Sequence, residues 1–220
     1  RLEDFWFMGY IFWAIGTATL LLVRPLDRRA WLLVAFNYLT AIWFTAGLSS
    51  NTHMWAAPYV MRTALWFSVP VYLQLHWNFP RPLPGASGRG WLALYGVAGF
   101  GALARWFDLL PRDAYVLPFG LAVVGSILLL VIHFFRSPGE RRETGILLFA
   151  ALGSLGPALL ISAVSADPNA SLSIAALLIS LPLLPMAYFY VLYRRQLGGL
   201  EIRANRLIAN YLFVFVLLIL

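Results

Sequence analysis

The chain has 220 residues, of which 61% are hydrophobic and only 11% are charged. Because soluble domains carry about 25% charged residues, this composition indicates a membrane protein. All 16 basic residues are arginine, the formal net charge is +7, and the absence of cysteine excludes disulfides, thiolate catalysis and sulfur-ligated metals. The arginines lie between apolar runs rather than along one continuous face, so we expect no nucleic-acid partner.

Seven apolar runs of about 20 residues, the length that a spanning helix needs, follow one another along the chain, and a shorter eighth run ends it. The runs are continuously apolar rather than alternating, which argues against strands. The sequence therefore predicts a single all-α domain, a polytopic transmembrane bundle of about eight helices. The last helix is cut short, as expected for a fragment of a longer chain. The predicted helices are 5–23, 30–50, 59–79, 91–110, 114–135, 145–165, 172–193 and 207–220.

The arginines alternate between the two sides of this predicted bundle. Twelve of the 16 lie in the connections that follow the first, third, fifth and seventh helices, whereas the connections 51–58 and 166–171 hold none. Cytoplasmic connections carry an excess of Arg and Lys. We therefore expect these four connections in the cytoplasm and the N-terminus outside.

Several polar residues lie inside or at the ends of the predicted helices. His76 and His133 occupy similar depths near the cytoplasmic ends of the third and fifth helices, with Gln74 beside His76. Two such imidazoles predict either hydrogen-bonded interfacial residues or ligands of a haem or bacteriochlorophyll. Arg62 lies about one turn from the outer end of the third helix, as an interfacial anchor or a contact of an outer cavity. All nine carboxylates lie in loops or near helix ends, which disfavours a transporter, and no arrangement indicates a catalytic site.

Two stretches carry a family resemblance. Residues 73–82, LQLHWNFPRP, are similar to the pattern that closes a membrane helix in the multi-helix N-terminal sensor regions of bacterial histidine kinases, the competence quorum-sensing kinases among them. Residues 185–206, PMAYFYVLYRRQLGGLEIRANR, resemble the hinge that follows in the same family, although Gly199 and Glu201 depart from it. The resemblance implies a sensor domain in the bacterial inner membrane, a further helix after residue 220 and a kinase domain elsewhere in the protein.

The resemblance also implies a homodimer that receives a peptide or lipophilic signal and performs no catalysis within these residues. We expect signal coupling through the charged hinge, which comprises Arg194, Arg195, Glu201, Arg203 and Arg206. The alternative hypothesis is an accessory transmembrane subunit of a larger photosynthetic or respiratory complex, with a pigment or haem on His76 or His133. An absorption spectrum separates these two hypotheses.

Overall fold

The computed structural model describes residues 7–23, 26–50, 54–85, 87–164 and 180–197. Within these ranges the chain forms seven α-helices, two short 3₁₀ helices and no strand, which confirms the all-α prediction. The expected helix 207–220 lies outside the described residues, so the count of eight stays a prediction. The helices are α1 (Phe7–Leu22), α2 (Arg28–Leu48), η3 (Met54–Ala56), α3 (Ala57–Asn78), α4 (Gly88–Trp106), α5 (Val116–Arg136), η4 (Pro138–Glu140), α6 (Arg141–Val164) and α8 (Leu183–Leu197).

Local signals set the helix boundaries. Asp27 caps α2, because its Oδ1 accepts a hydrogen bond of 2.9 Å from the Ala30 amide. The structure ends α4 at Trp106, before the predicted position 110. Asp108 takes a left-handed φ of 55°. The Leu109 N–H then donates a hydrogen bond to the Ala104 carbonyl, with an N-to-O distance of 2.8 Å. This arrangement satisfies a carbonyl that the last turn would otherwise leave unpaired.

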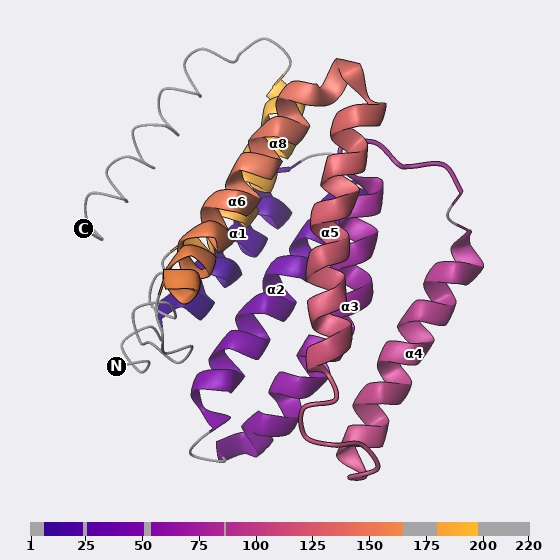
Figure 1. Cartoon of the computed structure of the whole chain (residues 1–220), viewed down its shortest axis with the longest axis vertical. Coiled ribbons are helices and arrows are strands. Elements are labelled where there is room, and N and C mark those ends of the chain that lie inside the picture. The colour runs from indigo at the N-terminus through magenta and orange to yellow at the C-terminus, as the bar shows by residue number, and fades with distance from the viewer. Residues whose placement is uncertain (1–6, 24–25, 51–53, 86, 165–179, 198–220) are drawn as a thin grey trace.

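Successive helices alternate in direction, and six of them close a ring (Figure 1). The ring runs through α1, α2, α3, α5, α6 and α8, and α8 packs back against α1 and α2. Helix α4 packs mainly against α3, outside the ring. The core fills the inside of the ring with buried apolar side chains, among them Phe12, Leu33, Phe36, Tyr72, Leu75, Leu130, Leu147, Tyr188 and Val191.

The structure differs from the predicted helix 172–193 at its middle. Leu181 and Pro182 form a turn, and α8 begins at Leu183 and continues to Leu197. Pro185 therefore falls in the first turn of α8, where its missing N–H has no intrahelical partner to lose. Ser180, on the other side of the turn, donates its hydroxyl to the Ser154 carbonyl at 2.6 Å. The break thus lies inside the bundle, against α6.

The lateral surface of the bundle is apolar. Side chains more than half exposed to solvent follow one face of α5 along its whole length, and others cover the outer face of α4. They are Leu117, Leu121, Val124, Leu128 and Phe135 on α5, and Leu92, Val97, Phe100 and Leu103 on α4. Two of the described helices, α2 and α5, are long and apolar enough to cross a membrane. The chain therefore has the features of a membrane-associated protein.

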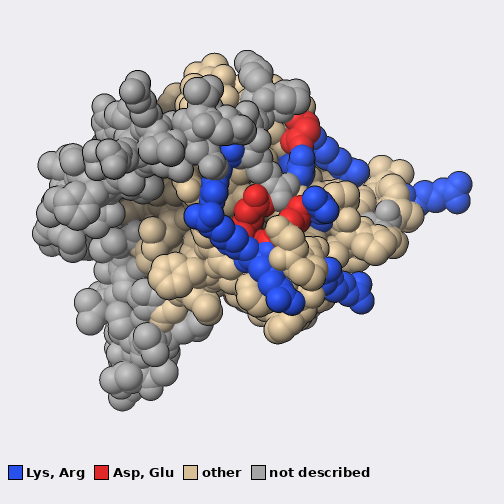
Figure 2. Space-filling view, turned by 90° about the horizontal axis from the view of Figure 1, so that it is seen from above, with Lys and Arg blue, Asp and Glu red and all other residues tan. Residues whose placement is uncertain are grey.

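Charged side chains gather at the end of the bundle where α1, α3, α5 and α8 finish, hereafter the basic end, which Figure 2 shows from above. Contacts made by two arginines, a hydrogen bond of Arg29 and an ion pair of Arg81, link its elements. Arg29 bonds Asp27 at 2.6 Å and the Pro80 carbonyl at 2.8 Å, so the start of α2 is tied to the end of α3. The described arginines of this end are Arg28, Arg29, Arg81, Arg89, Arg136, Arg141, Arg142 and Arg194, and its acids are Asp27, Glu140 and Glu143.

Arg81, just past α3, forms the ion pair between elements. Its Nε lies 2.6 Å from the Glu140 carboxylate, which is buried just before α6. Because a buried carboxylate needs a partner, this contact holds the end of α3 beside the start of α6. The described parts of the connections that the sequence predicts on one side of a membrane therefore lie together in the fold.

Candidate functional site

The six-helix ring encloses a cavity of about 260 Å³, hereafter the inner cavity. Each of the six helices contributes to its wall, and so does Leu181 of the turn before α8. The wall is mostly aromatic and aliphatic. The lining residues are Phe12, Phe36, Thr40, Trp43, Phe44, Tyr72, His76, Phe119, Val123, Ser126, Ile127, Leu130, Ala151, Ser154, Leu155, Leu181, Leu184 and Pro185.

Few polar groups reach this wall, and most of them are already paired. The Thr40 hydroxyl donates to the Phe36 carbonyl at 2.7 Å and lies 2.8 Å from the Tyr72 hydroxyl. Since Thr40 has given its only proton to its own helix, Tyr72 is the donor between the two hydroxyls. Ser154 donates to the Ala151 carbonyl at 3.0 Å. The bond between Tyr72 and Thr40 ties α3 to α2. Together the three bonds leave few polar groups of the wall free to meet a ligand.

Ser126 is different. Ser126 is only 5% exposed to solvent, and its hydroxyl has no hydrogen-bond partner among the described residues. Helical Ser and Thr residues commonly donate to the carbonyl four positions earlier. Thr40 and Ser68 do so in this chain, at 2.7 and 2.8 Å, but Ser126 does not. Among the described residues, the wall of the inner cavity therefore has two buried donors without a partner, the Ser126 hydroxyl and the Trp43 indole N–H.

Towards the basic end, three aromatic rings form a junction between α3 and α8. The Tyr188 ring lies edge-on to His76 at 5.4 Å and to Phe79 at 4.9 Å between ring centroids. All three side chains are at most 2% exposed. His76 and Phe79 belong to the stretch 73–82 and Tyr188 to the stretch 185–206. The fold thus brings the two stretches that carry the family resemblance into direct contact at this aromatic junction.

His76 and His133, the two histidines singled out in the sequence, are both buried and hydrogen-bonded. His76 Nδ1 lies 2.6 Å from the Tyr72 carbonyl, and His133 Nε2 lies 2.9 Å from the His76 carbonyl. A carbonyl only accepts, so each of these ring nitrogens carries a proton. The second bond joins α5 to α3 just below the aromatic junction. His76 therefore donates a hydrogen bond within α3, and His133 donates one from α5 to α3.

The haem or bacteriochlorophyll of the alternative hypothesis stays a prediction, although the inner cavity offers little room for it. The inner cavity beside His76 is smaller than the roughly 300–1,000 Å³ of pockets for drug-sized ligands, and a tetrapyrrole is larger than most such ligands. His133 does not line the inner cavity. Within the described residues no cluster of three or more His, Asp or Glu side chains is placed to hold a metal ion.

The remaining residues predicted from the sequence occupy separate places. Gln74 is buried and accepts a hydrogen bond of 2.9 Å from the Tyr95 hydroxyl, so it fastens α4 to α3. Arg62 is half-buried in the second turn of α3 and does not line the inner cavity.

Of the predicted hinge, Arg194 lies in the last turn of α8 at the basic end. The side chain of Arg195 lies outside the described residues, as do Glu201, Arg203 and Arg206. The structure therefore places the start of the hinge at the basic end and leaves the rest of it a prediction.

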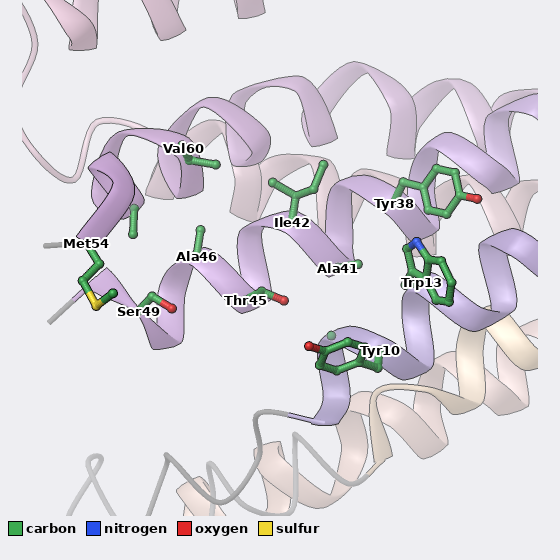
Figure 3. A pocket seen from close by; sticks show the side chains of 12 residues that line it. Tyr10, Trp13, Tyr38, Ala41, Ile42, Thr45, Ala46, Ser49, Met54 and Val60 are labelled. Atoms are coloured by element: carbon green, nitrogen blue, oxygen red, sulfur yellow. The ribbon is translucent and has the colours of Figure 1, made fainter. Parts of the chain in front are cut away.

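A second hollow, of about 730 Å³, lies on the side of the bundle between α1, α2 and the start of α3. In Figure 3, Tyr10 and Trp13 of α1 lie on one side of α2, and Ile42 of α2 points towards the side of Val60 of α3. Tyr10 and Trp13 are more than half exposed, so this hollow is an open lateral groove rather than an enclosed site.

The sequence drew attention to His76, which lines the inner cavity, but not to Ser126, which lines it as well. A single hydroxyl within the apolar run VVGSILLL was the signal available, and its meaning depends on which helix faces it. Comparisons with protein-family models, with curated proteins and with solved structures find no match for this chain.

Proposed function

We propose that this chain is the membrane-embedded sensor and signal-transducing domain of a histidine-kinase-like receptor. The observation that carries the proposal is the aromatic junction, where His76 and Phe79 of one kinase-like stretch pack on Tyr188 of the other. Stretches that are more than 100 positions apart in sequence are thereby joined in one structural unit. No catalysis is assigned to these residues, since the kinase domain that the resemblance implies lies outside them.

The surface supports a multi-pass arrangement. Exposed apolar side chains form a belt along α4 and α5, and apart from Arg62 the described charges lie at the helix ends or in the connections. A lateral apolar surface of this extent is stable in lipid rather than in water. Because Arg-rich connections stay in the cytoplasm, the basic end faces the cytoplasm of a bacterial inner membrane and the N-terminus lies outside.

The signal path follows α8. Leu184 and Pro185, in the first turn of α8, line the inner cavity, whereas Arg194, in its last turn, lies at the basic end. A helix moves as a rigid element, so a change in the wall of the inner cavity is transmitted to the predicted hinge. In this mechanism a signal stabilises one packing of the bundle over another, and the receptor acts as a homodimer with lipid and a peptide or lipophilic ligand as partners.

Membrane topology provides the first test, and the absence of native cysteine makes it direct. Ser87→Cys lies at the start of α4 on the basic end, and Asp113→Cys lies in the connection at the opposite end. A membrane-impermeant maleimide added to intact spheroplasts should label Asp113→Cys alone, with Ser87→Cys labelled only after permeabilisation. Labelling of both, or of Ser87→Cys alone, contradicts the proposed orientation.

Kinase coupling provides the second test. The protein encoded by the complete reading frame should autophosphorylate in inverted membrane vesicles supplied with ATP. Replacing Arg203 and Arg206 with Gln should change the phosphorylation level, whereas Arg89→Gln, at the exposed start of α4, should not. A complete protein without phosphotransfer refutes the kinase role, and an unchanged double variant refutes coupling through the hinge.

A further inference from the structure

We propose that the inner cavity binds one small, neutral lipophile that carries a single hydroxyl or carbonyl oxygen, and that Ser126 holds this oxygen. This inference deepens the proposed sensor function by naming the chemistry of the ligand, and it rests on that function for its biological meaning.

Size limits the ligand first. The inner cavity measures about 260 Å³. An apolar protein cavity of roughly 150 Å³ holds benzene, and pockets for drug-sized molecules begin near 300 Å³. The ligand is therefore larger than benzene and smaller than a typical drug, which corresponds to a single ring or a short chain with a small substituent. A peptide does not fit inside this cavity.

Charge limits the ligand next. Among the described residues that line the inner cavity there is no Asp, Glu or Arg. Moving an ion from water into such surroundings costs several kcal/mol unless a counter-ion compensates for it. Aromatic and aliphatic side chains make up most of the wall, including Phe12, Phe36, Trp43 and Phe119. The cavity therefore selects a neutral molecule with a large apolar part.

Ser126 supplies the polar contact. Its hydroxyl is buried in the wall and has no partner among the described residues, whereas the hydroxyls of Thr40, Tyr72 and Ser154 all have one. The Trp43 indole N–H, also in the wall, has no partner among those residues either and is a second donor for the same ligand oxygen. A buried hydroxyl without a partner is unfavourable, and a ligand oxygen beside it removes this cost. The His76 ring also lines the cavity, and its Nδ1 is engaged by the Tyr72 carbonyl, so Nε2 is the nitrogen left to accept from a ligand hydroxyl.

The position of the cavity connects the ligand to the signal path. Its wall includes Leu181 of the turn where the chain breaks before α8, together with Leu184 and Pro185. Irregular backbone at membrane depth is tolerated where it is buried in protein or lines a cavity. A ligand here contacts the first turn of α8 and favours one position of that helix over another.

The experiment measures binding of simple probes to the full chain in lipid nanodiscs. The probe is 4-ethylphenol, with toluene as the probe that lacks the oxygen and benzoate as the charged one, and the readout is saturable ligand-observed NMR corrected with empty nanodiscs. We expect saturable binding of 4-ethylphenol and no binding of benzoate. Ser126→Ala should weaken 4-ethylphenol by about 2- to 10-fold, the range for one hydrogen bond, and leave toluene unchanged.

Two further variants complete the design. Ala151→Phe fills the cavity and should abolish binding of 4-ethylphenol and toluene. Ser68→Ala removes a buried hydroxyl that bonds the Ala64 carbonyl and does not line the cavity, and it should bind as the parent chain does. If Ala151→Phe fails to fold, the comparison of Ser126→Ala with Ser68→Ala still decides.

The outcomes separate this inference from the proposed function. Equal binding of 4-ethylphenol by the parent chain and Ser126→Ala, or partition into nanodisc lipid alone, overturns the ligand site. A single ordered water on Ser126 that no probe displaces overturns it as well. Saturable binding that depends on Ser126, in a protein without kinase activity, supports the ligand site and refutes only the kinase role.

Discussion

The two large tyrosines of the core, Tyr72 and Tyr188, should respond in opposite ways when their hydroxyls are removed. The Tyr72 hydroxyl bonds Thr40 Oγ1 at 2.8 Å and thereby joins α3 to α2. The Tyr188 hydroxyl is buried and has no hydrogen-bond partner among the described residues, although its ring packs on His76 and Phe79. Tyr72→Phe therefore removes a bond, whereas Tyr188→Phe removes only an unsatisfied polar atom.

The magnitudes follow from the contacts. One net hydrogen bond contributes about 0.5–1.5 kcal/mol, with values near 0.6 kcal/mol common between membrane helices, so Tyr72→Phe should lower the free energy of unfolding by that amount. Tyr188→Phe should be neutral or stabilise the protein by up to about 1 kcal/mol. Tyr188→Ala deletes a ring that is fully buried and should cost about 3–5 kcal/mol.

Unfolding by sodium dodecyl sulfate in mixed micelles, followed by tryptophan fluorescence, measures all three variants against the parent chain. The nine tryptophans of the chain provide the signal. Refolding by dilution of the dodecyl sulfate establishes that the free energies refer to an equilibrium. A Tyr188→Phe variant that loses as much stability as Tyr72→Phe would show that the Tyr188 hydroxyl has a partner, and the packing described for the aromatic junction would then be incorrect.

Two further predictions concern helix contacts and caps. Gly101→Ala should destabilise by about 1–3 kcal/mol, because an added Cβ would lie 2.7 Å from the Trp66 ring and force α4 away from α3; Gly96→Ala, which meets nothing within 4 Å, should be neutral or stabilising by up to about 1 kcal/mol. The same unfolding assay measures both, and equal effects would contradict the close contact of α4 with α3. Asp27→Ala should lower the free energy of unfolding by about 1 kcal/mol, because the Ala30 amide loses its cap. Amide hydrogen exchange in the first turn of α2 measures this effect. Slower exchange in the variant than in the parent chain would argue against the capping role.

Much of the fold could be predicted from the sequence because its causes are local. Apolar runs of helical length specify where helices form, and the predicted 30–50 and 59–79 lie within two residues of the observed ends of α2 and α3. The alternation of Arg-rich connections predicts which helix ends lie together, and the described connections do lie together at the basic end. The end of α4 was predicted four residues too late, since α4 ends at Trp106 and Asp108 then takes a left-handed backbone conformation that hydrophobicity does not report.

The break of the helix at Pro182 could not be predicted from the local sequence. Prolines are tolerated within membrane helices when neighbours satisfy the freed backbone groups. Helix α3 continues through Pro70, yet the chain breaks at Leu181 and Pro182 and restarts at Leu183. Ser154 of α6 accepts from Ser180 beside this break. The contact comes from another helix, so the sequence of 172–193 alone predicts only a kink.

The sequence by itself therefore determined the all-helical class, the apolar surface of a membrane-associated chain and the concentration of most described arginines at one end, because composition and period act within a single segment. Only the tertiary structure decided that His76 and Phe79 meet Tyr188, that six helices enclose the inner cavity, and that Ser126 faces it without a partner. These features depend on how separate helices rotate and pack against one another. Packing of that kind is set by the shapes of side chains distant in sequence, which no local pattern contains.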